Sequence, residues 1–319
     1  MTLHQFAARY DLAPEELIPI NNGFQNSVYT FSKDGRDYIL RLSNRERKSF
    51  SDLENELKFI EALAKEGVSV SRPVPSKNNL LIEEVTNLFL VAFEKAQGVA
   101  VDVTDDNVWT TDLFYNWGKQ IGRMHKVSKL IQLERPKWTK EEPDLFRLLP
   151  KINSKLIKER YTKLLDELRD FHQDSNLFGL IHNDFHQGNF LVKDRRITVF
   201  DFDDCAYHWF AYDLAVSFYH AYWQASSFTP ERKDFSKIFW LHFLKGYEEE
   251  RAIYREMLEQ IPILLKIREI FLYVLFLEKW DLHSLAEWQA YTLEDLKHRI
   301  EEQIPYSNVN FKELIDNFS

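Results

Sequence analysis

The chain has 319 residues, a length that suits two domains or one bilobal protein, and its hydrophobic content of 45% supports a substantial core. The formal net charge of −9, with both signs interspersed, argues against the basic stripe of a nucleic-acid-binding protein. The lone cysteine, Cys205, excludes an intramolecular disulfide and a multi-cysteine metal site.

The first 94 residues predict an antiparallel sheet with one helix. Alternating or β-branched runs predict five strands, at residues 16–21, 27–31, 37–42, 80–83 and 88–93. Asp34-Gly35 predicts a hairpin turn between the second and third strands, and the prolines of residues 72–75 predict an extended crossing. Apolar residues at helical spacing predict a helix over residues 48–66.

The rest of the chain is predicted to be mostly helical, around a strand–loop–strand core at residues 179–204. Helices are expected at residues 109–125, 144–149, 151–171, 211–225, 232–250, 255–284, 291–303 and 309–318. The predicted fold class is therefore α+β, with a β-rich lobe at residues 1–94 and a helical lobe at residues 95–319. A hinge at residues 94–98 would place a ligand cleft between the lobes.

The stretch at residues 179–204 contains two short apolar runs, and each is followed by acidic or amide residues. Asp184 and Asn189 are separated by four residues in an H-x-D-x-x-x-x-N pattern, and a second run leads into Asp201 and Asp203. Hard cations such as Mg²⁺ prefer oxygen ligands of this kind, supplemented by substrate phosphates. Phosphoryl transfer needs such positioning and one carboxylate that accepts a hydroxyl proton. Each residue alone would also suit a turn.

Each of these four residues has its own expected role in the reaction. Asp184 is the candidate base, and Asn189 and Asp201 are the candidate metal ligands. Asp203 is a candidate ligand of a second ion or a group that orients the acceptor, and an ordinary turn residue is the alternative.

Three further polar residues surround this stretch. His182 is expected to anchor the loop by hydrogen bonds, and Asp213 is expected to brace it from a helix start by accepting backbone N–H groups. His186 is either a contact to the transferring phosphate or a histidine that packs the loop.

In the N-terminal lobe, Glu56 is predicted to lie on the apolar face of its helix, which is unusual for a charge without a partner. Arg41, on the third strand, is the natural partner and could clamp nucleotide phosphates. The alternative is an exposed strand arginine and an acid at the edge of an amphipathic helix.

Taken in order, these motifs resemble the aminoglycoside phosphotransferase and choline kinase superfamily of the protein-kinase-like fold, with the closest similarity to its homoserine-kinase-like bacterial branch. The residues that carry the resemblance are Gly23-x-x-Asn26-x-Val28-Tyr29, Tyr38-Ile39-Leu40-Arg41, Glu56, His182-Asn183-Asp184-Phe185-His186-Gln187-Gly188-Asn189, Phe200-Asp201-Phe202-Asp203-Asp204 and Ala211-Tyr212-Asp213-Leu214-Ala215.

The resemblance implies a bilobal kinase-like fold with ATP as co-substrate and Mg²⁺ as cofactor. It assigns the catalytic loop to residues 181–190 and the metal-binding segment to residues 197–204. It implies nucleotide contacts from Gly23 and Asn26, although the turn lacks the full glycine-rich pattern, and main-chain contacts to adenine near Glu94 and Ala96. Arg41 departs from the family, which usually keeps a lysine at that strand position.

The expected activity is ATP- and Mg²⁺-dependent phosphorylation of a hydroxyl group on a small metabolite, such as an amino alcohol or a hydroxy amino acid. Alternatives are an aminoglycoside antibiotic phosphotransferase and a catalytically silent nucleotide-binding module. Protein-kinase activity is disfavoured because Asp203 occupies the glycine position of the D-F-G motif.

The acceptor site is left open. Aromatic residues of the helical lobe with nearby acids could hold a cationic amine, or could simply be core; they are Tyr219, Tyr222, Trp223, Trp280 and Trp288, with Asp204 and Glu278. Arg268 could bind an acceptor carboxylate or form a buried ion pair. Without a signal-peptide pattern or a membrane-spanning stretch, the expected location is cytoplasmic, with neither a membrane nor a nucleic-acid partner.

Overall fold

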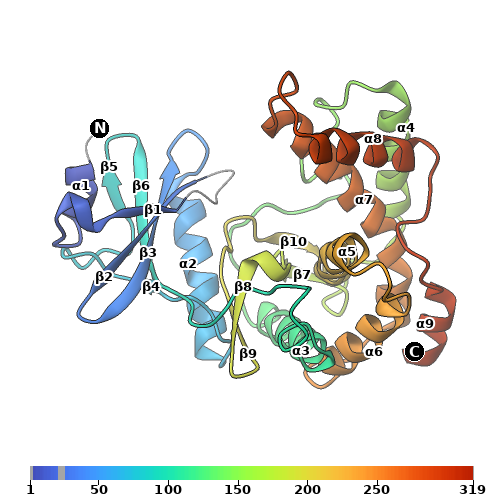
Figure 1. Ribbon diagram of the computed structural model, residues 1–319, viewed down its shortest axis with the longest axis horizontal. Coiled ribbons are helices and arrows are strands. Elements are labelled where there is room, and N and C mark those ends of the chain that lie inside the picture. Colours follow the sequence, from blue (N-terminus) through green and yellow to red (C-terminus); the bar gives the residue numbers. More distant parts are fainter. Residues whose placement is uncertain (1–2, 21–25, 319) are drawn as a thin grey trace. The chain divides into compact units, whose positions relative to one another are not determined.

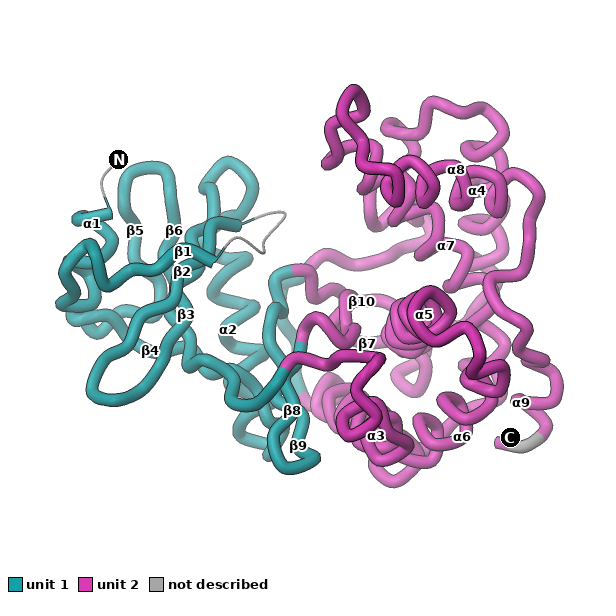
Figure 2. The backbone as a smooth tube through the Cα atoms, viewed as in Figure 1, with its two compact units in different colours: residues 1–99, 131–135, 190–203 teal, residues 100–130, 136–189, 204–319 magenta. Residues whose placement is uncertain are grey.

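The computed structural model describes residues 3–20 and 26–318. The chain forms two compact units (Figure 2). Unit 1 comprises residues 1–99, 131–135 and 190–203, and unit 2 comprises residues 100–130, 136–189 and 204–319. Residues 190–203 belong to unit 1 because their hairpin bonds to main-chain groups of Val99 and Ser71. The predicted division at residue 94 would have kept this segment with the helical lobe.

Unit 1 is built on an antiparallel sheet (Figure 1). Its strands lie in the order β1 (Ile18–Ile20), β2 (Ser27–Lys33), β3 (Arg36–Asn44), β6 (Leu88–Glu94) and β4 (Pro73–Val74), and β5 (Glu83–Val85) also pairs with β6. The predicted hairpin at Asp34-Gly35 is confirmed: Lys33 pairs with Arg36, and both turn residues have positive φ. That backbone twist matches the twist of the two strands.

One expectation about this sheet was incomplete and one was wrong. Residues 73–74 are extended, as expected, but they also form strand β4, because Pro73 pairs with Phe93 at the edge of the sheet, where a proline is tolerated. The strand expected at residues 80–83 begins only at Glu83. The residues before it form a turn in which the Ser76 hydroxyl accepts hydrogen bonds from the amides of Asn78 and Leu80.

The predicted helix of unit 1 is present as α2 (Phe50–Lys65). The Ser49 side chain accepts a hydrogen bond from the Asp52 amide, and the Asp52 carboxylate accepts one from the Ser49 amide, which caps the first turn. The helix ends before Gly67, whose φ of 80° is in the left-handed region. Its apolar residues at helical spacing are buried, as the spacing predicts.

Two short ladders flank the catalytic-loop sequence. In unit 2, β7 (Phe178–Ile181) pairs antiparallel with β10 (Ala206–Trp209). In unit 1, β8 (Phe190–Lys193) pairs antiparallel with β9 (Arg196–Val199), with Phe190 opposite Val199. Strand β10 was not predicted, because its four residues are short and run directly into a helix.

Helices supply most of unit 2. Their bounds are α3 (Thr111–Ser128), α4 (Lys155–Leu168), α5 (Phe210–Phe228), α6 (Phe235–Glu248), α7 (Arg255–Lys279), α8 (Glu287–Glu301) and α9 (Phe311–Phe318), with a 3₁₀ turn η2 (Gln187–Asn189); unit 1 adds α1 (Leu3–Ala7) and η1 (Pro14–Glu16). The helix expected at residues 144–149 is wrong. There the Asp144 carboxylate accepts hydrogen bonds from the amides of Leu148 and Leu149, which closes a turn instead.

Close helix packing defines the core of unit 2, where α3 packs against α6 and α5 packs against α7. Glycines permit the first contact. A Cβ atom at Gly118 of α3 would lie 1.8 Å from the Phe243 carbonyl oxygen, and one at Gly246 of α6 would lie 1.9 Å from that of Tyr115. Over the described part of the chain, every helix is too short or too polar to cross a membrane.

Candidate active site

The loop after β7 is held in place by hydrogen bonds to one buried carboxylate. Asp213, in the first turn of α5, accepts hydrogen bonds from the amides of His182 (3.0 Å) and Asn183 (2.8 Å). This geometry lets Asn183 adopt a φ of 72°, which turns the chain sharply toward Asp184. Asp213 therefore has the hydrogen bonds expected of a residue that braces the loop.

His125 of α3 completes this support and was missed by sequence analysis. Its Nε2 atom lies 3.1 Å from the Asp213 carboxylate, and its Nδ1 atom lies 3.1 Å from the Tyr247 hydroxyl. Burial lowers the pKa of His125 to about 4 despite the opposing influence of Asp213. The ring is therefore neutral at pH 7 and donates its one N–H to Asp213. Because 88 residues separate His125 from Asp213, no local pattern could have revealed the pair.

Asp184 lies at the tip of this loop, with 28% of its side chain exposed. Its Oδ1 atom accepts a hydrogen bond from Arg268 Nη2 of α7 at 2.5 Å. Its Oδ2 atom accepts one from Asn189 Nδ2 at 3.2 Å, and the same nitrogen donates to the Asp184 carbonyl at 2.8 Å. The H-x-D-x-x-x-x-N spacing thus brings Asp184 and Asn189 into direct contact.

The charge state of Asp184 follows from its neighbours. Burial alone would raise its pKa, but the positive charge of Arg268 and the ring of His186 outweigh burial and hold the pKa far below its usual range. At neutral pH the group is a carboxylate, which is the form that can accept a proton from a hydroxyl group.

The two loop histidines occupy different environments. His182 is fully buried, stacks against Phe185 with ring centroids 5.3 Å apart, and accepts a hydrogen bond from the Asp184 amide through Nδ1 at 3.4 Å. His186 is half-buried and stacks on His220 of α5 at 4.3 Å, with its Nε2 atom 3.5 Å from Asp184 Oδ2. His182 is thus packed in the core and bonds to the loop backbone, whereas His186 lies beside the carboxylate.

The residues proposed from sequence as metal ligands flank one hairpin. Asn189 immediately precedes β8, and Asp201 follows β9 after one residue, so both leave the same end of that antiparallel ladder. Asn189 uses its side-chain nitrogen in both hydrogen bonds to Asp184, which leaves its oxygen for a cation. Asp201 is exposed and has a φ of 65°. Amide and carboxylate oxygens are of the kind that Mg²⁺ prefers as ligands.

In unit 1, the predicted ion pair between Arg41 and Glu56 is present and bidentate, with N–O distances of 2.9 and 2.7 Å. Both side chains are almost completely buried, and the Arg41 guanidinium lies over the Phe93 ring. Burial opposes the charge of Arg41, but Glu56 and the nearby carboxylates raise its pKa further above its usual range. The alternative of an exposed, unpaired arginine is therefore wrong.

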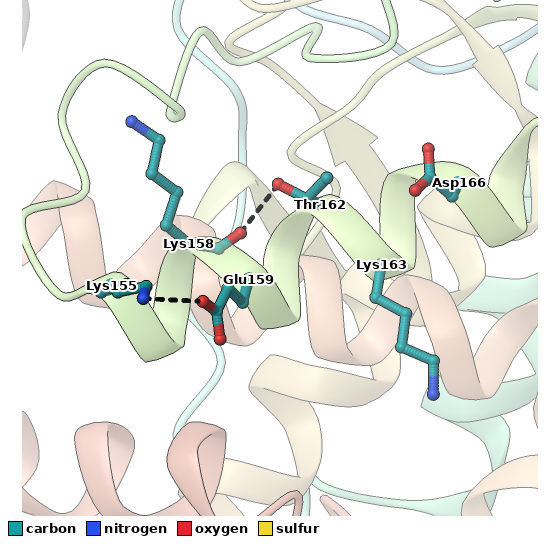
Figure 3. A pocket seen from close by; sticks show the side chains of 6 residues that line it. All are labelled: Lys155, Lys158, Glu159, Thr162, Lys163 and Asp166. Atoms are coloured by element: carbon teal, nitrogen blue, oxygen red, sulfur yellow. Dashed lines mark hydrogen bonds and ion pairs between the residues drawn. The ribbon is translucent and has the colours of Figure 1, made fainter.

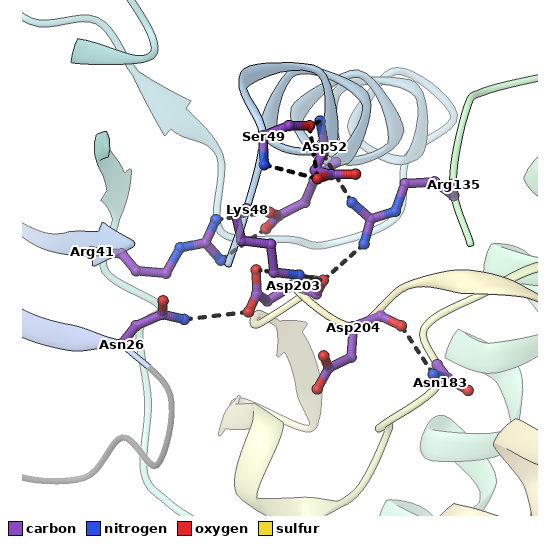
Figure 4. Close-up of polar contacts among 10 residues, drawn as sticks. Asn26, Arg41, Lys48, Ser49, Asp52, Arg135, Asn183, Asp203 and Asp204 are labelled. Carbon is purple, nitrogen blue, oxygen red and sulfur yellow. Dashed lines mark hydrogen bonds and ion pairs between the residues drawn. The ribbon is translucent and has the colours of Figure 1, made fainter. Parts of the chain in front are cut away.

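Asp203 is surrounded by donors (Figure 4). Lys48 Nζ lies 3.1 Å from its carboxylate, and Asn26 Nδ2 donates to the same carboxylate at 3.3 Å. Lys48 and Arg135 also donate to its carbonyl oxygen. Burial would raise the pKa of Asp203, but Arg41 and Lys48 lower it below its usual range. Sequence analysis missed Lys48 and Arg135, which follow no recognisable motif.

The other residues predicted to contact the nucleotide lie in different surroundings. Gly23 lies outside the described residues, whereas Asn26 immediately precedes β2 and contacts Asp203. Glu94 ends β6, and its amide donates to the Arg72 carbonyl. The Lys95 amide donates to the Asp37 carbonyl. Of the predicted adenine-binding positions, Ala96 is therefore better suited to a main-chain contact than the Glu94 amide.

The predicted acceptor-site aromatics divide into core and surface. Tyr219 is buried and stacks on Tyr306 at 3.9 Å, and Trp280 stacks on Phe276 at 4.2 Å. Trp288 packs edge-on against Trp280 but is 61% exposed. Glu278 forms an exposed ion pair with Lys151 at 3.1 Å. Tyr219 is thus a core residue, and Trp288 is the predicted aromatic with the most accessible ring.

A surface depression along α4 does not belong to this site. Figure 3 shows that one helix supplies its whole lining, which consists of Lys155, Lys158, Glu159, Thr162, Lys163 and Asp166. Lys155 and Glu159 form an exposed ion pair one turn apart, at 3.8 Å. Such a charged, solvated helix face needs no ligand to explain it.

Comparisons with known proteins give a consistent result. Residues 16–253 match the model of a family described as the phosphotransferase enzyme family. An amicoumacin kinase from Bacillus subtilis (strain 168) is 31% identical over 324 residues, which cover 98% of this chain and 95% of the relative.

Solved structures agree with that relationship. Amicoumacin kinase hAmiN in complex with AMP-PNP, Ca²⁺ and Ami superposes with a TM-score of 0.90 and 30% identity, covering 98% of this chain and 96% of that one. A microcompartment-associated aminopropanol kinase superposes with a TM-score of 0.72 and 21% identity over 93% and 94% of the two chains, which shows a shared fold. The protein-kinase-like α+β fold predicted from the sequence is thereby confirmed.

Proposed function

Because the chain belongs to the phosphotransferase enzyme family and is an ATP-dependent kinase of a small-molecule hydroxyl group, we propose that Asp184 is its catalytic base. The supporting observation is a carboxylate held ionised and partly exposed at the tip of a braced loop. The hydroxyl proton passes to Asp184, the hydroxyl oxygen bonds to the γ-phosphorus of ATP, and ADP leaves.

The enzyme uses ATP and a divalent metal ion, for which Mg²⁺ is the expected species. We propose Asn189 and Asp201 as its protein ligands, because both offer oxygen donors and flank the same end of the β8–β9 hairpin. Asp203 would have to exchange Lys48 for the metal, so it ranks behind Asp201. When bound, the metal neutralises charge on the transferring phosphate.

The nucleotide phosphates are assigned to Arg41 in this proposal, with Glu56 fixing the guanidinium. A bidentate carboxylate holds arginine in one orientation and leaves its other edge for phosphate oxygens. Asn26 supports the same region through Asp203. A main-chain contact from Ala96 to the base completes the assignment.

We propose that the acceptor is amicoumacin or a compound closely related to it. The support is the similarity to amicoumacin kinases along almost the whole length of both chains. Because 30–31% identity leaves many acceptor-contacting positions free to differ, the test compares amicoumacin with amino alcohols, hydroxy amino acids and aminoglycosides.

The experiment measures ADP release with each acceptor for the wild-type enzyme and for Asp184→Asn. Amicoumacin should give the highest turnover, and Asp184→Asn should lower kcat by about 10²- to 10⁴-fold because the base is lost. Asp281→Asn, at an exposed aspartate of the same unit, is the control and should keep wild-type turnover. Wild-type turnover in Asp184→Asn would refute the assignment of the base, and a better acceptor would replace amicoumacin.

We also propose that the enzyme works in the cytoplasm on a free small molecule, without a nucleic-acid or membrane partner. Its use of ATP, its single cysteine and its net charge of −9 support this assignment. Fractionation of producing cells, with detection of the protein in the soluble cytoplasmic fraction, tests the location.

A further inference from the structure

We propose that Arg268 of α7 is a positioning residue for the reaction, which orients the Asp184 carboxylate toward the acceptor hydroxyl; the inference depends on Asp184 being the base. The Arg268 side chain is only 4% exposed and lies in the middle of a long helix. Its Nη2 atom donates to Asp184 Oδ1 at 2.5 Å. Its guanidinium also lies over the Phe271 ring, 4.9 Å from the centroid.

The other charged residues of α7 indicate that Arg268 forms its ion pair with the loop that carries Asp184. Burying an arginine is costly unless an acid and hydrogen bonds compensate it. The adjacent acid, Glu269, pairs instead with Arg299 at 2.9 Å and Lys266 at 3.2 Å. Within the described part of the chain, the carboxylate bound to Arg268 is that of Asp184, 84 residues away in the sequence.

The two carboxylate oxygens of Asp184 have different partners. Arg268 holds Oδ1, whereas Oδ2 faces Asn189 Nδ2 at 3.2 Å and His186 Nε2 at 3.5 Å. Two restraints on opposite oxygens fix the plane of the carboxylate. Phosphoryl transfer depends more on such alignment than on a strong base. Arg268 would therefore contribute to the orientation of the Asp184 carboxylate.

His220 of α5 fixes Arg268 in turn. Its Nε2 atom lies 2.7 Å from Arg268 Nη2 and accepts that hydrogen bond, and its ring stacks on His186. Burial and the nearby charges of His186 and Arg268 lower the pKa of His220 well below its usual range, so the ring stays neutral and can accept. Helices α5 and α7 thus hold the base jointly.

The same contacts argue against an alternative use of these residues. Asp184, His186 and His220 lie close enough together to suggest a metal site. However, Asp184 Oδ1 and His220 Nε2 both face the Arg268 guanidinium. A cation between them would have to displace a buried arginine, so the cluster is better explained as a support for the base.

The test measures kcat and both KM values for Arg268→Ala, with amicoumacin or the best acceptor of the panel above. We expect kcat to fall about 100-fold because one oriented donor is lost. The KM values for ATP and acceptor should stay within about threefold, because ground-state binding is unaffected. Methylguanidine at millimolar concentration should restore kcat at least about tenfold by occupying the vacated space, and Arg268→Lys should keep partial activity.

The control is Arg251→Ala, at another buried arginine of unit 2 that donates to the carbonyl oxygens of Ser175 and Asn176. It should lose stability, keep its turnover per folded molecule, and show no response to methylguanidine.

The proposal fails if Arg268→Ala retains wild-type kcat, or if its defect resists methylguanidine and Arg268→Lys is equally inactive. A tenfold rise in acceptor KM alone would instead assign Arg268 to acceptor binding. Wild-type activity in Asp184→Asn would show that Asp184 is not the base and would overturn this proposal together with the proposed function, whereas the outcomes for Arg268 above overturn this proposal alone.

Discussion

At the scale of single residues, the site depends on buried polar groups that satisfy one another. Asp213 accepts two backbone amides and the His125 ring, and Arg41 is matched by both oxygens of Glu56. Because an unpaired buried charge is costly, each of these groups is coupled to its partner. Removing one partner is therefore expected to cost more than removing both.

His125 gives a prediction about pH. Its pKa is about 4 in the folded state and about 6.5 when the chain is unfolded, so the unfolded chain binds a proton first as the pH falls. The stabilising contribution is complete above pH 6.5 and is lost between pH 6.5 and 4. At pH 5 the loss from this residue should be about 2 kcal/mol.

Urea unfolding at pH 7 and pH 5 measures this effect in the wild-type protein and in His125→Gln. The variant should show a pH dependence that is smaller by about 2 kcal/mol. His283→Gln, at an exposed histidine, is the control and should behave as the wild type. Equal pH dependence of His125→Gln and the wild type would contradict a buried neutral His125.

At the scale of elements, helix packing decides where the site residues lie. Helix α7 carries Arg268 to Asp184, and α5 carries both Asp213 and His220. Contact between α3 and α6 helps to set the position of His125, because Tyr247 of α6 contacts its Nδ1 atom. The glycines in that contact are therefore expected to matter for the site as well as for stability.

Gly118→Ala tests this dependence. Its Cβ atom would lie 1.8 Å from the Phe243 carbonyl oxygen, so the helices must move apart, which should cost about 3 kcal/mol or more. Gly122→Ala, whose Cβ would lie 2.8 Å from the Tyr247 carbonyl oxygen, should be milder. Gly67→Ala is the control without a packing contact, because no atom lies near its Cβ, although its positive φ adds backbone strain. Chemical unfolding ranks the three, and equal stability of Gly118→Ala and the wild type would contradict the packing.

At the scale of the whole molecule, some variants should lose catalysis but keep Mg-ATP binding, and others should lose Mg-ATP binding itself. Mg-ATP is expected to stabilise the folded protein by mass action, by about 2.7 kcal/mol at a hundred times its Kd. Asp184→Asn should keep this stabilisation because the base is not needed for binding. Asp201→Asn should lose most of it because a proposed metal ligand is gone.

Thermal unfolding with Mg-ATP, and with ATP plus EDTA, provides the measurement. Asp194→Asn is a matched control, because Asp194 is also exposed, also has a positive φ and lies in the turn between β8 and β9. It should respond to Mg-ATP as the wild type does. A full response of Asp201→Asn would move the metal away from Asp201 and favour Asp203.

Local sequence patterns predicted the parts of this protein that depend on neighbours along the chain. Period-two and helical spacings predicted the sheet and helix of unit 1 and most helices of unit 2, because local backbone geometry produces those periods. The fixed spacing from Asp184 to Asn189 predicted a contact that one loop can close unaided. The same spacing, with Asp201 and the other motifs in order, carries the family resemblance that implied a kinase.

Contacts between distant segments could be identified only from the three-dimensional fold. The pairing of Arg268 with Asp184 and of His125 with Asp213 spans more than 80 residues in each case. Such pairs depend on which helix faces pack together, and an arginine in an apolar helix has no local signature that names its partner. The sequence offered an acceptor carboxylate and a buried ion pair as alternatives for Arg268, and helix packing selected the ion pair.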